Sequence, residues 1–242
     1  PPGHFYIWIT IDPDLRGQGL GSTLFEEAQA FLRGQSAFSQ ESEVRDDDPV
    51  SLNFAEKRGF KFQRHKFGSS LDITMFDEKP YLEILHNLET EGVRFFSLAD
   101  MGDTMDARRK LHEVNYETVL DIPGAKQDWL SFEQFVDLVC HSDWYRPEGQ
   151  FAAAIGETWV GLSAVQLLPE EEAAYNLMTG VRKPYRGRKI AQALKFLAIH
   201  YARENGARFF RTDNDSLNES ILAINRKLGY RPEPGKYILW KD

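Results

Sequence analysis

The sequence predicts a mixed α/β protein built from two copies of one domain, and three observations lead to this fold class. Apolar, strand-like segments alternate with segments whose apolar residues recur at helical spacing. An Arg-Gly pair follows a strand and opens a helix twice, at Arg16-Gly17 and at Arg186-Gly187. A glycine followed by an aromatic residue also recurs, at Gly59-Phe60 and Gly229-Tyr230, with the same offset of 170 positions. Because such a repeat is too long for a solenoid unit, we interpret it as a duplicated domain.

The composition is that of a globular chain with one or two domains. The 242 residues are 42% hydrophobic and 27% charged, and the net charge is −8. This charge argues against nucleic-acid binding and favours a neutral or cationic small substrate. The single Cys140 excludes an internal disulfide and a cysteine-based metal site, and no metal is expected. No apolar run approaches the ~20 residues of a membrane span, and Pro1-Pro-Gly-His lacks the features of a signal peptide. We therefore expect a cytoplasmic protein without a membrane partner.

In the first copy, turn signals divide the chain into short elements. The segment 4–11 is nearly all apolar, as in a buried strand, and the segment 20–33 has its apolar residues on one side of a helix. Asp46-Asp-Asp-Pro49 is a helix-start signal. We expect, in order, a strand at 4–11, a helix at 20–33, a polar strand at 38–44, a helix at 52–57 and a hairpin that pairs 60–65 with 71–76 through Gly68-Ser-Ser.

The second copy follows a predicted linker helix at 78–92, where apolar residues again recur at helical spacing. Ser131, followed by Glu133 and Gln134, is typical of a capped helix start. The elements expected are, in order, strand 93–98, helices 103–119 and 131–140, a hairpin of strands 151–155 and 158–168, strand 174–181, helix 189–204, strand 207–212, helix 217–228 and a last hairpin through Pro232-Glu-Pro-Gly to strand 237–240.

The two copies differ in length before their Arg-Gly turns. The second has about ninety residues there and the first has only fifteen, so the first lacks roughly 77 residues. An incomplete sheet of this kind would expose a strand edge and half a core. We therefore predict a truncated domain, the C-terminal half of one copy, at 1–77, the linker helix at 78–92 and a complete domain at 93–242. Pro1 is not expected to be the natural start.

The turn at Arg186-Gly187 has the chemistry of an anion site. It joins a strand to a helix that opens near Arg188. The first backbone N–H groups of a helix have no partner within it, and the helix dipole places partial positive charge there. Arg186, Arg188 and Lys189 add full charges. The sequence therefore predicts a phosphate-binding turn.

With its two Arg-Gly turns, the chain resembles the GCN5-related N-acetyltransferase (GNAT) superfamily, in a tandem arrangement similar to that of mycothiol synthase. The family's acyl-CoA motif is Arg/Gln-x-x-Gly-x-Gly/Ala after a strand ending in Val-x-Pro. The first copy matches it with Ile11-Asp-Pro and Arg16-Gly-Gln-Gly-Leu-Gly21, whereas the second has Lys189 at a glycine position and its proline displaced to Pro184. A second shared motif, a helix ending in Gly-Phe/Tyr, closes each copy. The resemblance covers essentially the whole chain and implies two GNAT-like domains, each a twisted, mostly antiparallel mixed sheet flanked by helices, the N-terminal one incomplete.

The resemblance implies acetyl-CoA as co-substrate, with its pyrophosphate on the turn and its pantetheine arm between the strands 174–181 and 207–212. The amine acceptor would attack the thioester directly, without a covalent enzyme intermediate. The implied cofactor-binding residues of the second copy are Thr179, Val181, Arg186, Gly187, Arg188, Lys189, Ile190, Ala191, Asn214, Asn218 and Asn225. Those of the first copy are Ile11, Arg16, Gly17, Gln18, Gly19, Leu20 and Gly21.

The catalytic residues are where this sequence departs from the family pattern. Many members place a tyrosine four residues before the Gly-Phe as acid to the leaving thiolate, and here that position holds Ala55 or Asn225. Asn225 could hydrogen-bond the sulfur but is no general acid, and its alternative role is to satisfy the end of its helix. Tyr175 is the first alternative acid, beside Tyr185 and Tyr230, and Glu172 is a candidate base; each is also explained as a packing or surface residue.

Two functions therefore remain open at this stage. The first is an acyl-CoA-dependent N-acyltransferase that acts on a small amine, with the second copy as the working domain. The second is a non-catalytic acyl-CoA sensor or scaffold, for which the missing tyrosine in both copies argues. The sequence identifies neither the amine nor the oligomeric state, and a homodimer is compatible with it.

Overall fold

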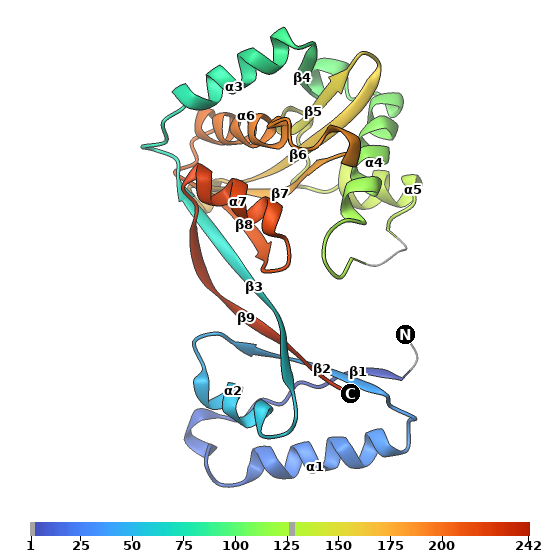
Figure 1. Ribbon diagram of the computed structural model, residues 1–242, viewed down its shortest axis with the longest axis vertical. Helices are drawn as coiled ribbons and strands as arrows, with labels where there is room; N and C mark the ends of the chain where they lie inside the picture. Colours follow the sequence, from blue (N-terminus) through green and yellow to red (C-terminus); the bar gives the residue numbers. More distant parts are fainter. Residues whose placement is uncertain (1–2, 126–128) are drawn as a thin grey trace. The chain divides into compact units, whose positions relative to one another are not determined.

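The computed structural model describes residues 3–125 and 129–242, so Pro1 and the question of the chain's natural start lie outside the described residues. The strands lie in one sheet in the order β1-β2-β9-β3-β8-β7-β6-β5-β4 (Figure 1). They are β1 His4–Tyr6, β2 Ser39–Arg45, β3 Lys61–Asp72, β4 Val93–Ser97, β5 Gln150–Ile155, β6 Thr158–Leu168, β7 Ala173–Val181, β8 Phe209–Asp215 and β9 Arg231–Lys241. The α-helices are α1 Leu20–Arg33, α2 Pro49–Glu56, α3 Lys79–Thr90, α4 Met105–Val119, α5 Phe132–Phe135, α6 Ile190–Glu204 and α7 Glu219–Leu228.

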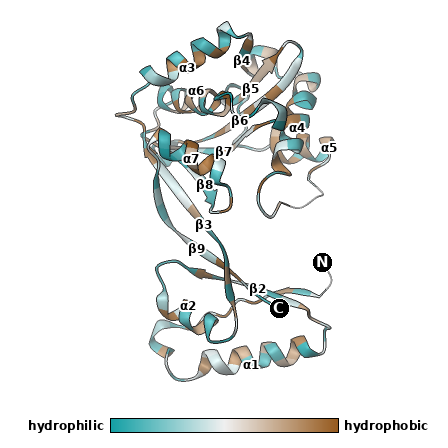
Figure 2. Cartoon of the chain, in the orientation of Figure 1, coloured by the Kyte–Doolittle hydropathy of each residue, from teal (hydrophilic) through white to brown (hydrophobic). Residues whose placement is uncertain are grey.

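The fold class predicted from the sequence is confirmed, because helices flank a mixed sheet in which antiparallel pairs dominate. The pairs β2–β9, β4–β5, β5–β6 and β6–β7 are antiparallel, whereas β1–β2 and β7–β8 are parallel. Hydrophobic and hydrophilic segments alternate along the helices, as amphipathic helices on a sheet require (Figure 2). Within the ranges that the structure describes, no helix has both the length and the apolarity needed to cross a membrane.

The chain forms two compact units. Unit 1 contains the residues up to Phe67, Asp215–Leu217 and Glu233–Asp242, and unit 2 contains Gly68–Asn214 and Asn218–Pro232. The strands β3 and β9 therefore contribute residues to both units. The domain boundaries predicted from the sequence, with a linker helix at 78–92, stay a prediction.

Unit 2 has helices on both faces of its sheet, as the alternation of side chains along β5 shows. Ala152 and Ala154 pack in a cluster with Leu111 of α4 and with α5, whereas Ala153 packs with Leu194 of α6 and with α3. These alanines have no exposed surface. Successive residues of one strand thus cover two separate cores, and α6 lies on the opposite face from α4.

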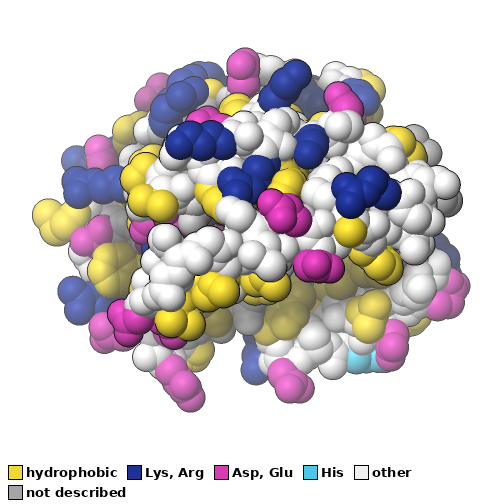
Figure 3. Space-filling model, turned by 90° about the horizontal axis from the view of Figure 1, so that it is seen from below, with side chains coloured by type: hydrophobic (Ala, Val, Ile, Leu, Met, Phe, Trp, Pro, Cys, Tyr) yellow, Lys and Arg dark blue, Asp and Glu magenta, His cyan; other side chains and the backbone are white. Residues whose placement is uncertain are grey.

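Unit 1 has a smaller core under α1 and α2. Its buried members are Ile7, Leu32, Ala55, Phe60 and Leu239. The predicted start of α2 is confirmed, since Pro49 occupies its first turn and the Asp48 side chain accepts from a backbone N–H. Several apolar side chains of α1 remain exposed, and the face in Figure 3 shows hydrophobic side chains among basic and acidic ones.

Two predicted hairpins are wrong, because each is one continuous strand. The turn expected at Gly68-Ser-Ser lies inside β3, which ends at Asp72, so most of the strand expected at 71–76 is absent. The turn expected at Pro232-Glu-Pro-Gly lies inside β9. Gly235 is needed there for close approach rather than for a turn, since a Cβ atom on it would lie 2.2 Å from the carbonyl oxygen of Lys66. The strand expected at 4–11 is also shorter, as β1 ends at Tyr6.

The other predicted elements are confirmed with small shifts of their ends. The hairpin of 151–155 with 158–168 is β5 and β6, and the helix at 20–33 is α1. Ser131 and Gln134 form the expected reciprocal cap at the start of α5. This helix continues from Val136 to Cys140 as a π-helix, so the element at 131–140 changes its hydrogen-bonding pattern half-way.

The close approach at Gly235 gives the first prediction. Gly235→Ala should lower the melting temperature, since the added methyl group forces two backbones apart at a cost on the order of 1–3 kcal/mol. The control is Gly34→Ala at the C-terminus of α1, where φ is −82° and the nearest atom to a Cβ would be 3.5 Å away. Equal melting temperatures for the two variants, in a thermal scan by circular dichroism, would contradict this interpretation of β9.

Candidate functional site

The predicted phosphate-binding turn lies between β7 and α6. A short 3-10 helix at Lys183–Tyr185 leads into it, and Gly187 and Lys189 then have positive φ angles of 80° and 67°. The N–H groups of Gln192 and Ala193 donate to the carbonyl oxygen of Lys189 at 2.9 and 3.1 Å. The helical ladder thus begins at Lys189, and the N–H groups before Gln192 precede it. This arrangement presents backbone donors and positive charge to an anion.

Arg186 braces the turn. Its Nε donates to the carbonyl oxygen of Val181, the last residue of β7, at 2.8 Å. Its guanidinium also pairs with Asp121, which Lys183 reaches from 2.7 Å. Hydrogen bonds from Lys183 and then from Arg186 hold the pKa of the Asp121 carboxyl below its usual value. Arg186 therefore ties the turn to the strand and to the end of α4, and its charge is already shared with a carboxylate.

The first copy of the turn has the same backbone in unit 1. Gly17 and Gly19 have φ angles of 79° and 86°, and the N–H groups of Ser22 and Thr23 donate to the carbonyl oxygen of Gly19 at 2.9 and 3.1 Å. Arg16 likewise donates from Nε to the carbonyl oxygen at the end of the preceding segment, Ile11, at 3.3 Å, and lies 3.5 Å from Asp48. Both motif turns predicted from the sequence therefore exist with matching geometry.

The glycines of these turns are required by conformation and not by crowding. A Cβ atom on Gly17, Gly19 or Gly187 would meet none of the described atoms within 4 Å. Lys189 occupies the position of Gly19 and adopts its left-handed conformation, which costs a non-glycine residue roughly 1–2 kcal/mol. Lys189 is exposed at the start of α6.

The strands β7 and β8 separate where the implied pantetheine arm would enter. Their parallel pairing joins Ala173–Tyr175 to Phe209–Arg211 and ends there, within the part of the chain that the structure describes. Beyond it, the Thr212 hydroxyl donates to the carbonyl oxygen of Asn176 at 3.0 Å. A side chain therefore replaces the next ladder bond at the point of divergence, and the remaining length of β7 has no strand pairing with β8.

A β-bulge lies at the same point of β7. Ala164 pairs with Met178 and Val165 with Asn176, so Leu177 is the extra residue. The Asn176 side chain braces the bulge, since it donates to Ser163 Oγ at 3.0 Å and accepts from Thr179 Oγ1 at 2.9 Å. We did not predict Asn176 from the sequence. Its signal is an amide in the middle of an apolar strand, where an unpartnered polar group would be costly.

The structure brings together two of the predicted asparagines. Asn225 on α7 donates from Nδ2 to Asn214 Oδ1 at 2.7 Å, and Asn214 donates to Ser69 Oγ at 2.8 Å. Asn214 is in β8, beyond the end of its pairing with β7. Asn218 has a different role, since it caps α7 and its side chain accepts a hydrogen bond from the Ile221 N–H at 3.4 Å.

The predicted acid, Tyr175, and the predicted base, Glu172, lie at the paired end of β7, away from the turn. Tyr175 is in the last residue pair between β7 and β8, opposite Arg211. Glu172 precedes the paired end of β7, at the opposite end of the strand from the turn, and its carboxylate forms an exposed ion pair with Arg208 at 3.3 Å. Tyr185 belongs to the 3-10 helix of the turn. The structure does not place Glu172 beside Asn225, and its role as base stays a prediction.

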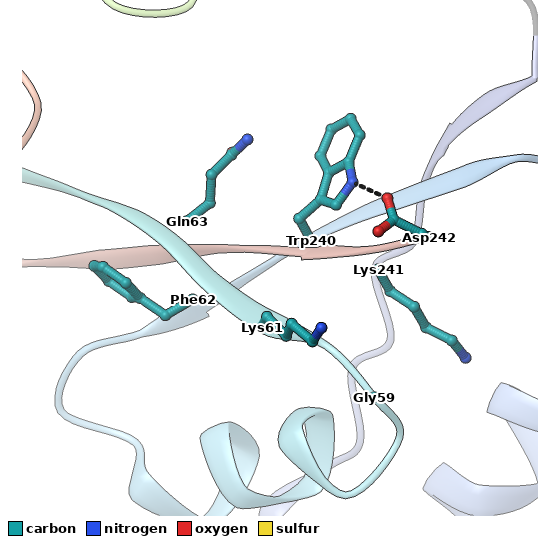
Figure 4. A pocket seen from close by; sticks show the side chains of 7 residues that line it. All are labelled: Gly59, Lys61, Phe62, Gln63, Trp240, Lys241 and Asp242. Atoms are coloured by element: carbon teal, nitrogen blue, oxygen red, sulfur yellow. Dashed lines mark hydrogen bonds between the residues drawn. The ribbon is translucent and has the colours of Figure 1, made fainter.

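Unit 1 also contains a hollow of about 360 Å³ beside β3 and β9. Figure 4 shows that Trp240 and Gln63 project from one side of the two strands and that Phe62 and Lys241 project from the other. The Trp240 indole donates to Asp242 at 2.9 Å. The hollow is lined by Gly59 of the Gly-aromatic motif but by none of the residues of the phosphate-binding turns, so it is not the site of the predicted chemistry.

Two strands that diverge, followed by a turn that presents backbone donors, form an arrangement suited to an anionic ligand with an extended arm. The sequence profile of the acetyltransferase (GNAT) family matches residues 1–60 and 116–230, which is more than half of the chain. The chain therefore belongs to this family of acyl-CoA-dependent acetyltransferases, as the sequence motifs predicted. No curated protein matches the chain.

Solved structures share the fold at low identity. A GCN5-related N-acetyltransferase from Sphaerobacter thermophilus is 18% identical, with a TM-score of 0.65 over 96% of this chain and 70% of the other. A tandem GNAT protein from the clavulanic acid biosynthesis pathway is 17% identical, with a TM-score of 0.61 over 96% and 72%. The glucosamine N-acetyltransferase region of a fungal GH3 β-N-acetylglucosaminidase is 14% identical, with a TM-score of 0.70 over 97% of this chain and 29% of the other. The tandem arrangement is thus shared with a known structure.

The matching turns give a reciprocal prediction. Lys189→Gly should raise the melting temperature of the chain, because it removes a left-handed lysine, and Gly19→Lys should lower it by a similar amount, about 1 kcal/mol each. Differential scanning calorimetry of the two variants measures this. Destabilisation by Lys189→Gly would show instead that the lysine side chain stabilises the turn.

Proposed function

We propose that the chain transfers the acetyl group of acetyl-CoA to a small amine, and that residues 93–242 are the working domain. The single observation that supports this most is the alignment of three features on β7: the bulge at Leu177, the divergence from β8 and the phosphate turn after Val181. The divergence and the bulge lie at the same part of β7, and the turn follows at its end. An extended acyl-CoA would then place its thioester near the bulge, its arm along the separated strand and its pyrophosphate at the turn.

The pyrophosphate would bind the N–H groups from Arg188 to Ala191, ahead of the helical ladder. Lys189 and Arg188 would add charge from exposed positions, although Arg188 also pairs with Glu91 at 3.2 Å. The pantetheine amides would pair with β7 between Asn176 and Val181, where β8 has separated. The remaining predicted cofactor residues, Thr179, Gly187, Ile190, Asn214 and Asn218, would lie along this path as part of the proposal.

The reaction would be direct attack of a neutral amine on the thioester carbonyl carbon. The protein's contribution is then to position the two reactants, to take up a proton and to stabilise the oxyanion. The bulge leaves backbone groups of β7 without a ladder partner near Leu177, which suits the last task. The chain's net charge of −8 favours an amine that is cationic in solution.

Unit 1 would support unit 2 and bind acyl-CoA only weakly. Asp48 caps α2 where unit 2 has Asn218, and its pKa is lowered first by the hydrogen bond from the Ser51 N–H. A carboxylate there repels an anionic ligand unless Arg16, 3.5 Å away, neutralises it. Ala55 in place of Asn225 also offers no polar group to a thioester.

The test of this function combines binding with turnover. Calorimetry with acetyl-CoA should give saturable binding, and thiol release should be detected with at least one member of a panel of amino sugars, polyamines and aromatic amines. Binding with no turnover across the panel would favour the alternative, a non-catalytic acyl-CoA sensor. No binding would contradict both functions.

The assignment of the working domain is tested by a matched pair of charge reversals. Arg186→Glu should weaken acetyl-CoA binding and lower kcat/KM by ten-fold or more, since a lost charge-assisted brace is worth roughly 1.5–3 kcal/mol. Arg16→Glu makes the same change at the equivalent position of unit 1 and should leave kcat/KM within a few-fold. If Arg16→Glu abolishes turnover and Arg186→Glu does not, the working unit has been assigned the wrong way round.

A further inference from the structure

Three polar side chains of unit 2 are buried without a hydrogen-bond partner for their outermost atoms. They are Lys195 on α6, Asn225 on α7 and Tyr230 just after α7, with exposed fractions of 1%, 3% and 6%. Lys195 Nζ, Asn225 Oδ1 and the Tyr230 hydroxyl each lack a partner among the described residues. Because burying a polar group unpaired is costly, buried polar atoms in folded proteins nearly always bind something, and a group of three points to a ligand.

Direct contacts connect these three residues to the diverging strands. Lys195 Nζ lies over the Tyr230 ring, 4.9 Å from its centroid, and the Tyr230 N–H donates to the carbonyl oxygen of Asn225 at 3.0 Å. Asn225 in turn bonds to Asn214, which is in the part of β8 that has left β7. The cluster therefore lies where α6 and α7 meet β8: Asn225 contacts the separated part of that strand, and the Tyr230 ring lies 6.4 Å from the ring of Phe210 in the paired part. Lys195 is six residues past Lys189, or about 9 Å along the helix from the phosphate turn.

Unit 1 shows that the fold does not require polar groups at these positions. At the repeat offset of 170, Lys195, Asn225 and Tyr230 correspond to Phe25, Ala55 and Phe60. Phe25 and Phe60 pack edge to face with their centroids 6.3 Å apart, and all three residues belong to the apolar core of unit 1. The same place in the repeat is thus filled by apolar side chains in one copy and by unpartnered polar ones in the other.

Burial also changes the acidity of the lysine. It lowers the pKa of Lys195 to about 7, and it is the only cause of this shift. Tyr230 is the titratable group that faces the ammonium from the neighbouring element, and burial raises the pKa of its hydroxyl. An amine that exchanges its proton near neutral pH is suited to acid–base chemistry.

We propose that Lys195, with Asn225 and Tyr230, forms the thiol end of the acyl-CoA site in unit 2, where the Lys195 ammonium protonates the sulfur of departing CoA. This proposal rests on the proposed function. As the amine nitrogen bonds to the carbonyl carbon, the carbon–sulfur bond breaks and its electron pair stays on sulfur. Lys195 gives one proton to that thiolate and becomes a neutral amine, and the proton lost by the acceptor nitrogen returns the charge through solvent. The role that a tyrosine has elsewhere in the family would thus come from a different helix.

The test compares Lys195→Met in unit 2 with Phe25→Met, the same change at the equivalent position of unit 1. Lys195→Met should raise the melting temperature, since it removes an unpaired buried amine, while it lowers kcat for the best amine of the panel about 100-fold. Binding of acetyl-CoA should change no more than a few-fold. Phe25→Met should leave kcat within two-fold of the wild type. A stabilised Lys195→Met variant with wild-type kcat would overturn the proposal, because the lysine would then be a structural residue only.

The pH profile separates catalysis from packing. The acid form of Lys195 is lost as the pH rises through about 7, so kcat of the wild type should fall above that pH and the residual rate of Lys195→Met should not.

If Lys195→Met does not fold, the same point is tested by NMR of wild-type protein with ¹³C-labelled lysine. The Lys195 signal should shift with CoA and less with desulfo-CoA, and equal shifts would overturn the proposal. A wild type that binds acetyl-CoA and turns over, with no effect at Lys195, refutes this inference alone; a wild type without turnover refutes it together with the proposed enzyme.

Discussion

The site in unit 2 depends on the separation of β7 from β8 after three residue pairs. A parallel ladder that continued past Tyr175 would satisfy its own backbone groups and leave no edge for an extended ligand. Two features end it: the bulge at Leu177, which changes the twist of β7, and the Thr212 hydroxyl, which takes the place of the next ladder donor. The separation leaves buried backbone groups of β7 and β8 without ladder partners. A row of buried polar side chains forms hydrogen bonds with some of them.

That row explains why so many polar residues lie in an otherwise apolar unit. Ser163, Asn176, Thr212, Asn214 and Asn225 are each less than 9% exposed. Most of their hydrogen-bonding groups are paired with one another or with the backbone, so their burial costs little net free energy. Among the described residues that are less than 9% exposed, the side-chain atoms without a partner are those of Lys195, Asn225 and Tyr230. A pattern in which all but a few adjacent groups are satisfied is typical of a binding site and not of a poorly packed core.

The duplication separates what the backbone requires from what the chemistry requires. Both copies keep the left-handed residues of the turn and the arginine bond to the preceding carbonyl, at Arg16 and at Arg186. These features fix the path of the chain into a helix. The interior behind the turn has diverged from Phe25 in one copy to Lys195 in the other. Selection on folding alone explains the first set, and it does not explain a buried, unpaired lysine.

The sequence predicted the backbone well where local signals decide it. Helix caps at Asp48 and Ser131, the paired motif turns and the order of the elements all follow from short-range chemistry, and they are confirmed. Gly235 misled the prediction, because a glycine that follows Pro-x-Pro is typical of a turn, and only the position of Lys66 on the neighbouring strand shows the close approach. Lys195 was missed for a similar reason, because a lysine on an amphipathic helix is expected on the exposed side of that helix. Its burial is shown only by the packing of its side chain against Tyr230.

The central claim is that one acyl-CoA binds along β7 of unit 2. A crystal structure of the chain with acetyl-CoA tests it most directly. We expect the pyrophosphate against the N–H groups from Arg188 to Ala191, the pantetheine arm between β7 and β8, and the sulfur beside Lys195. An acetyl-CoA bound at Gly17–Gly21 of unit 1, with the space between β7 and β8 unchanged, would contradict the account.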